Sequence, residues 1–180
     1  MATKQRPASL RSNKNAAEIA RAVRVQYGAL PYRLAETNSL EILLVTTRQT
    51  RRWIIPKGWP IKGLKPSQSA AREAYEEAGV RGKVGAKSIG VFCWEKRMEE
   101  GVGVTPCEVR VFPMLVKRHF DLWPEAHERE ARWFDARAAV AVVKIDGLRE
   151  LIETFLKKRV RKRAAKKARA KASLKAKAAR

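Results

Sequence analysis

The stretch Gly58–Val80 reads GWPIKGLKPSQSAAREAYEEAGV and ends in an acidic cluster followed by a glycine. Its second half predicts a helix. Pro66-Ser67 marks the start, with Ser67 as the expected cap, and Gly79 marks the stop because glycine readily adopts the left-handed conformation. One arc of this helix carries mostly small residues, which allow close packing against a sheet: Ala70, Ala71, Ala74, Tyr75 and Ala78.

Three carboxylates share the opposite arc of the predicted helix. Glu76 and Glu77 follow Glu73 at i+3 and i+4, within about 60° of it on the helical wheel. They repel one another, and only Arg72 stands nearby to offset them. A hard divalent cation is therefore the expected neutralising partner. For the helix alone, an ordinary amphipathic surface helix with solvated charges is the alternative.

The spacing of this cluster from an upstream glycine sets the alternative aside. It closely resembles the Nudix box, a glycine followed at set spacing by R-E-U-x-E-E-x-G-U, in which U is aliphatic. One position departs, because family members usually carry a glutamate six residues after the first glycine and this chain has Leu64 there. The positions that match in register are Gly58, Arg72, Glu73, Glu76, Glu77, Gly79 and, as the final aliphatic residue, Val80.

Resemblance to the Nudix (MutT-like) family implies an α/β fold, an α/β/α sandwich around a mixed β-sheet. It also implies hydrolysis of a diphosphate linked to another moiety, by water attack on phosphorus. The implied cofactor is Mg²⁺, with Mn²⁺ as a substitute, held by Glu73, Glu77 and the Gly58 carbonyl, with Glu76 in the same acidic set. Glu76 also matches the general base of one branch, although other members place the base elsewhere. Arg72 is expected to brace the carboxylates from the flank.

The substrate expectation rests on a second resemblance. The stretches ILLVTTRQTRRWIIPKG, VRGKVGAKSIGVFCWEKR and EREARWFDARAAV look like the diphosphoinositol polyphosphate phosphohydrolase branch, which also cleaves dinucleoside polyphosphates. Lys57-Gly58-Trp59 replaces that branch's three glycines and is expected to reshape the phosphate entry. Two alternatives stay open, an RNA 5′-end pyrophosphohydrolase and a Nudix module that binds without hydrolysis. The intact glutamates argue against the second.

Basic residues flank the acidic cluster in sequence, and a polyphosphorylated substrate needs such charge. We expect substrate contacts from Arg48, Arg52, Lys57 and Arg97, of which Arg52 and Arg97 match basic positions of the branch. Further candidates are Arg33, Arg51 and Lys96. The alternative for each of them is an ordinary surface charge on a basic domain.

The 180 residues, 45% of them hydrophobic, are enough for one sizeable core, and the resemblance implies one Nudix domain at residues 21–157. A flexible basic arm is expected at 1–20. The Lys/Arg/Ala-rich tail at 158–180 is expected to be flexible, either disordered or an extension of the last helix that becomes ordered on an anionic partner. The expected strands are 25–34, 41–47, 53–56, 84–95, 108–117 and 130–134, and the expected later helices are 137–143 and 147–158.

Charge and cysteine content complete the expectations. The formal net charge is +22, and residues 157–180 hold 13 Lys or Arg and no acid. The favoured interpretation is a solubilising or weakly RNA-associated tail, and the alternative is a targeting or tethering arm for nucleic acid or polyphosphate. No apolar run suits a membrane span or a signal peptide. Cys93 and Cys107 lack metal-site spacing and predict buried free thiols. A cytoplasmic protein, monomeric or homodimeric, is expected.

Overall fold

The structure is a computed structural model that describes residues 24–37, 39–97 and 104–178. The predicted arm at residues 1–20 lies outside the described residues. The elements in chain order are β1 (Arg24–Leu34), β2 (Leu40–Thr46), β3 (Trp53–Ile54), β4 (Lys57–Gly58), α2 (Pro66–Ala78), β5 (Val80–Val84), β6 (Gly90–Arg97), β7 (Val104–His119), β8 (Ala131–Asp135), α3 (Ala136–Val142) and α4 (Asp146–Ala178).

The strands form one eight-stranded mixed sheet. Its main path runs β3-β2-β1-β7-β5, with β4 also paired to β1, β6 to β7 and β8 to β2. The long strands β1 and β7 are parallel, from Arg24↔Cys107 to Tyr32↔Leu115, and the other pairings are antiparallel. On its side away from β1, β7 pairs with β6 along its first half and with β5 along its second half.

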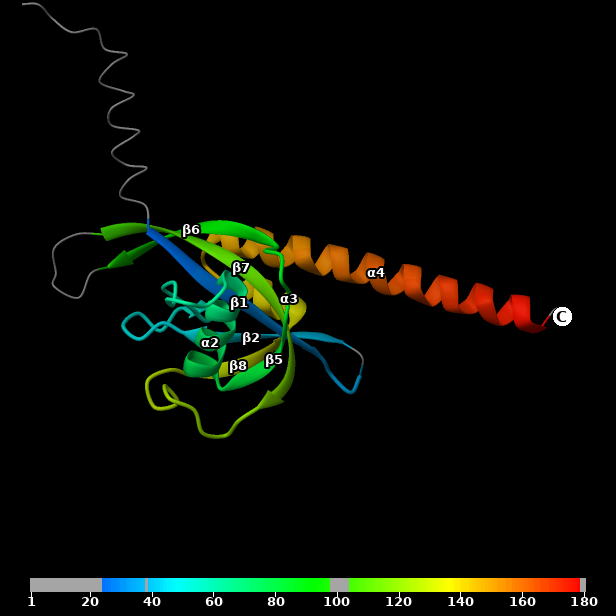
Figure 1. Ribbon diagram of the computed structural model, residues 1–180, viewed down its shortest axis with the longest axis horizontal. Coiled ribbons are helices and arrows are strands. Elements are labelled where there is room, and N and C mark those ends of the chain that lie inside the picture. Colours follow the sequence, from blue (N-terminus) through cyan, green and yellow to red (C-terminus); the bar gives the residue numbers. More distant parts are fainter. Residues whose placement is uncertain (1–23, 38, 98–103, 179–180) are drawn as a thin grey trace, which may run out of the picture.

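Helices cover both faces of this sheet, α2 one face and α3 with α4 the other (Figure 1). Phe155 of α4 packs on Tyr32 of β1, with 5.1 Å between the ring centroids. On the other face, Ala70 and Ala74 of α2 are fully buried, so the small residues do bring this helix close to the sheet. The predicted α/β/α sandwich is confirmed.

The ends of α2 follow the sequence signals with one correction. Gly79 ends the helix in the left-handed conformation (φ 64°), and its amide donates to the carbonyls of Ala74 and Tyr75. The cap, however, is Lys65 rather than the predicted Ser67. Pro66 takes the first helical position, because it needs no amide partner there, and Gln68 reaches back to accept from the Lys65 amide at 2.9 Å.

The predicted single strand at 84–95 is wrong, because two strands occupy this region. The chain turns between β5 and β6, after Val84 and before Gly90, and each strand pairs with a different half of β7. Gly82 permits the tight pairing of β5, since a Cβ at this position would lie 2.0 Å from the Leu115 carbonyl oxygen. Alternation along β6 also exposes Cys93 beside the buried Phe92, so of the two free thiols only Cys107 is buried as predicted.

The last helix is far longer than the predicted 147–158. It runs to Ala178, so the described part of the predicted flexible tail is helical. The first turns of α4 pack against the core through Leu148, Ile152 and Phe155, and this anchored start removes the cost of nucleation for the Ala, Lys and Arg that follow. Within the described residues, no helix is both long and apolar enough to cross a membrane.

Candidate active site

A carboxylate of α2 lies directly against the main chain of β4. β4 pairs with β1 at Tyr27↔Gly58, which places Gly58 beneath the helix. A Cβ at Gly58 would stand 2.1–2.3 Å from the carboxylate atoms of Glu73. Any side chain at this position would therefore displace the Glu73 carboxylate, and this is the physical reason for the fixed glycine ahead of the acidic cluster.

The second carboxylate of the cluster, Glu77, is buried, with 5% of its surface exposed. Its Oε2 accepts from the Lys57 amide at 3.0 Å, and its Oε1 pairs with the Arg129 guanidinium at 2.6 Å. Both oxygens are thus held in place, one by the strand that carries Gly58 and one by a residue far along the chain.

Arg129 belongs to an ion-pair chain that the sequence did not reveal. Its Nε pairs with Glu125 at 2.5 Å, and its Nη1 donates to the Thr46 carbonyl at 3.1 Å. Glu125 in turn pairs with Arg48 at 2.7 Å, and its amide donates to the Glu76 carbonyl at 3.1 Å. The segment after β7 is therefore tied to α2 and to the end of β2. The EREARW stretch gave a family signal, but nothing in it separates the half-buried Arg129 from the exposed Arg132.

Glu76 points to a different partner. Its Oε1 pairs with Arg72 at 2.5 Å, so Arg72 does brace the cluster from the flank, as predicted. Within the described residues, no three acidic, histidine or cysteine side chains are already gathered closely enough for a metal ion. Glu73 and Glu77 lie together at β4, and Glu76 stands beside them, engaged with Arg72.

The electrostatics of the cluster favour a cation. Burial raises the pKa of Glu77, an effect that Arg129 and Lys57 oppose. Burial also raises the pKa of Glu73 to about 7, and neighbouring carboxylates add to the rise: Glu77, Glu76 and Glu125. Negative charge is thus crowded into a partly dry site, and its oxygen donors suit a hard divalent ion such as Mg²⁺ or Mn²⁺.

The predicted phosphate-binding residues differ in what their side chains contact. Arg52 is exposed, and its guanidinium has no hydrogen-bond or ion-pair partner among the described residues. The Lys57 ammonium lies 4.2 Å from the centre of the Trp94 ring. Arg48 pairs with Glu125 and Glu128, so in this arrangement carboxylates hold it.

The remaining basic candidates lie elsewhere. Arg33 is six residues further along β1 than Tyr27, the partner of Gly58, which puts it about 20 Å from the cluster, where it pairs with Glu41. Arg51 donates to the Glu128 carbonyl at 2.9 Å. The side chains of Lys96 and Arg97, at the end of β6, lie outside the described part of the structure.

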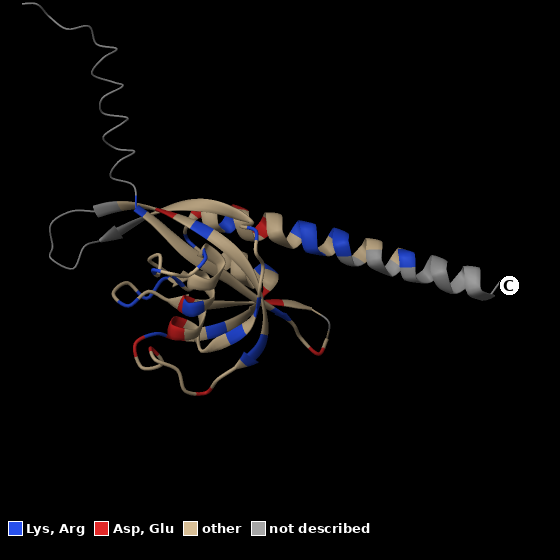
Figure 2. Cartoon of the chain, viewed as in Figure 1, with Lys and Arg blue, Asp and Glu red and all other residues tan. Residues whose placement is uncertain are grey.

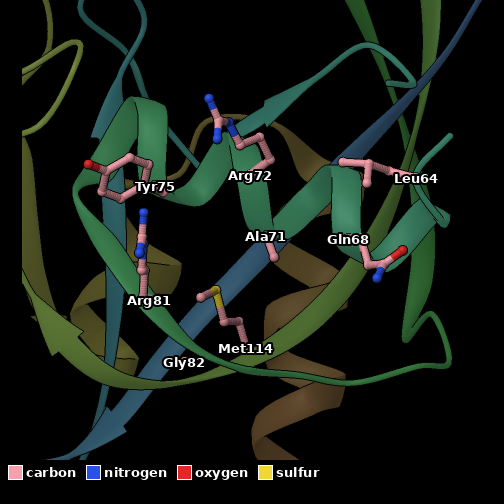
Figure 3. Close-up of a pocket in the computed structure, with 8 residues that line it drawn as sticks. All are labelled: Leu64, Gln68, Ala71, Arg72, Tyr75, Arg81, Gly82 and Met114. Carbon is pink, nitrogen blue, oxygen red and sulfur yellow. The ribbon is translucent and has the colours of Figure 1, made fainter. Parts of the chain in front are cut away.

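A pocket of about 310 Å³ lies on the other flank of α2 (Figure 3). Its lining positions on the helix point about 100–180° away from Glu73 and Glu77, so this pocket is separate from the acidic cluster. The residues that line it are Leu64, Gln68, Ala71, Arg72, Tyr75, Arg81, Gly82 and Met114.

Comparison with known proteins agrees with this arrangement. The chain matches the family model described as the NUDIX domain over residues 27–155. Nudix hydrolase 13, mitochondrial, of Arabidopsis thaliana is 28% identical over 151 residues, 74% of each chain. Diphosphoinositol polyphosphate phosphohydrolase 3-alpha of Mus musculus is 33% identical over 107 residues, 58% of this chain and 60% of that one. A solved binary complex of the C. elegans Ap4A hydrolase has a TM-score of 0.55 at 19% identity, covers 74% of this chain and 95% of that one, and supports the fold.

The chain therefore belongs to the Nudix family. It is a hydrolase of this family, which acts on phosphoanhydrides of small phosphorylated substrates and generally uses divalent cations.

The buried pair of Arg129 with Glu77 generates a stability prediction. Replacing Arg129 by Met leaves Glu77 buried without its cation, so the free energy of unfolding in urea is expected to fall by about 3 kcal/mol or more. Arg132→Met is the matched control, because Arg132 pairs with Glu130 at an exposed position (60% of its side chain) and should cost about 1 kcal/mol or less. Equal losses of unfolding free energy in the two variants would show that the Arg129 ion pairs stabilise the protein no more than an exposed ion pair does.

Proposed function

We propose that this Nudix hydrolase cleaves a phosphoanhydride bond in a polyphosphorylated small molecule, such as a diphosphoinositol polyphosphate or a dinucleoside polyphosphate. The observation that carries the proposal is the Glu73 carboxylate packed on Gly58, beside the buried Glu77. The named activities of the mouse and C. elegans relatives support the substrate class.

In this proposal Glu73, Glu77 and the Gly58 carbonyl hold the divalent cation, with Glu76 in the same acidic set. The ion, Mg²⁺ or Mn²⁺, supplies charge neutralisation of the phosphates and acidification of water when bound. Arg129 and the Lys57 amide keep the Glu77 carboxylate in one orientation, so it need not be reorganised when substrate arrives.

Glu76 is proposed as the general base. Its carboxylate takes a proton from the attacking water as a new O–P bond forms, and the bond from phosphorus to the bridging oxygen breaks. The leaving phosphate keeps the electron pair of that bond. Arg72, at 2.5 Å from Glu76, fixes the direction of the base. A positioned base of this kind typically contributes a factor of about 10²–10⁴ to the rate.

Arg52, Lys57 and Arg97 are proposed to contact the outer phosphates, and Arg48 to support them from the loop that Glu125 holds. The guanidinium of Arg52 supports the first assignment, because it is exposed and has no ion-pair partner among the residues that the structure describes, so a substrate phosphate can bind it without displacing any of them. A cytoplasmic location is also proposed, supported by the two free cysteines.

A second candidate function is hydrolysis at the 5′ end of RNA. The observation in its favour is the basic extension of α4, whose cations attract a polyanion to the enzyme. Release of phosphate or pyrophosphate from triphosphorylated RNA, compared with turnover of a dinucleoside tetraphosphate, separates the two functions.

The metal assignment predicts the behaviour of Glu77→Gln. This variant should stay folded but lose a factor of about 10² or more in turnover, because a neutral amide is a poor ligand and cannot offset cation charge. Wild-type activity should require Mg²⁺ or Mn²⁺ and vanish with a chelator. Glu36→Gln, at an exposed turn between β1 and β2, is the control and should match the wild type. Near wild-type turnover in a folded Glu77→Gln variant would contradict the assignment of Glu77 as a metal ligand.

The substrate class predicts a selective effect of Arg52→Ala. Because alanine cannot bind a phosphate, KM should rise about tenfold or more for a substrate with many phosphates and little for a sugar nucleotide, since a charge-assisted hydrogen bond contributes about 1.5–3 kcal/mol. Arg137→Ala is the control: it removes an exposed cation of α3 and should leave KM unchanged for both substrates. An equal loss of activity on both substrates in Arg52→Ala would assign Arg52 a structural role instead.

A further inference from the structure

The C-terminal half of α4 leaves the body of the protein. Arg159 still contacts the sheet layer, and its guanidinium lies 4.7 Å from the centre of the Tyr32 ring. Val160, the next residue, is 66% exposed. The residues beyond it whose side chains are described are all exposed: Arg161, Lys162, Ala164, Ala165, Ala168 and Arg169. Figure 1 shows this part of the helix projecting past the sheet, and Figure 2 shows lysines and arginines along its coloured part.

We call residues 157–178 of α4 the basic arm. It contains 12 of the chain's 40 Lys and Arg and no acidic residue. At 100° per residue these cations fall on all sides of the helix and leave no continuous apolar stripe. The arm therefore has no face with which to pair with a second helix or to lie in a membrane surface. Its like charges repel at spacings of three and four residues, and a bound polyanion would relieve this repulsion.

The dimensions of the arm favour duplex DNA among the polyanions. A helix of this length spans about 30 Å, so it carries roughly one cation per 3 Å of its axis. DNA carries one phosphate charge per about 1.7 Å, and its major groove, about 12 Å wide, admits an α-helix. The major groove of duplex RNA is too narrow for this, and the arm has no aromatic residue on which the bases of a single strand can stack.

We propose that the basic arm docks on duplex DNA through its phosphates, without reading the base sequence. In the structure, the arm is the continuation of a helix whose first turns are already anchored in the core at Leu148 and Ile152. Little ordering entropy is then lost on binding, in contrast to a disordered basic tail. The active site is made of other elements, so this docking is independent of the hydrolysis proposed above.

The test uses the full chain and two variants with the same change in net charge. The arm variant replaces Lys166, Lys167, Arg169 and Lys171 by Gln, a good helix former. The body variant replaces four exposed cations of the domain by Gln: Lys83, Lys87, Arg137 and Lys144. Binding to a mixed-sequence DNA duplex is measured by fluorescence anisotropy between about 50 and 200 mM salt. Circular dichroism and turnover of a small phosphoanhydride substrate check the fold and the active site.

The arm variant is expected to lower the slope of log affinity against log salt by about three units, because each phosphate that the protein no longer neutralises removes about 0.9. The body variant should keep the wild-type slope, and both should keep wild-type turnover. An unchanged slope in the arm variant, or an equal loss in the body variant, would overturn the proposal. Tighter binding to single-stranded RNA, duplex RNA or anionic lipid vesicles than to duplex DNA would overturn it as well.

Discussion

The close contact between the Glu73 carboxylate and Gly58 is the constraint on which the rest of the site depends. A helix can present a carboxylate to a neighbouring main chain only where that main chain has no side chain. The contact sets α2 against β4, which pairs with β1 at Tyr27↔Gly58, so the acidic face of the helix lies beside this pair of strands. The small residues Ala70 and Ala74 permit the same close approach from the helix side.

Hydrogen bonds and ion pairs around Glu77 also hold α2 close to β4. Glu77 receives the Lys57 amide from the strand and the Arg129 guanidinium from the segment after β7. Arg129 also engages Glu125, so one guanidinium compensates two carboxylates that repel each other. Even so, burial raises the pKa of Glu73, and the negative charge of the neighbouring carboxylates adds to this rise. A divalent ion bound by these carboxylates and the phosphates of a substrate would balance this negative charge.

Local patterns in the sequence predicted the parts of the fold that depend on nearby residues. The helix from Pro66 to Gly79, its acidic face and its family follow from spacing within one stretch. Arg129 could not be predicted, because two of its partners, Glu77 and Thr46, lie 52 and 83 positions away and an identical residue stands three positions on. A helix as far as Ala178 was expected only on an anionic partner, since the charge pattern opposes an isolated helix unless tertiary packing provides the nucleus.

The affinity of Gly58→Ala for Mn²⁺, measured by calorimetry without substrate, tests the central claim most directly. The three atoms nearest to the added Cβ all belong to the carboxylate end of Glu73, which can rotate away, so the variant should unfold at nearly the wild-type urea concentration, yet bind Mn²⁺ about tenfold or more weakly. Gly63→Ala is the control: its φ of 83° strains alanine in open space, so it should lose stability and keep the wild-type affinity. Wild-type Mn²⁺ affinity in Gly58→Ala would contradict the account.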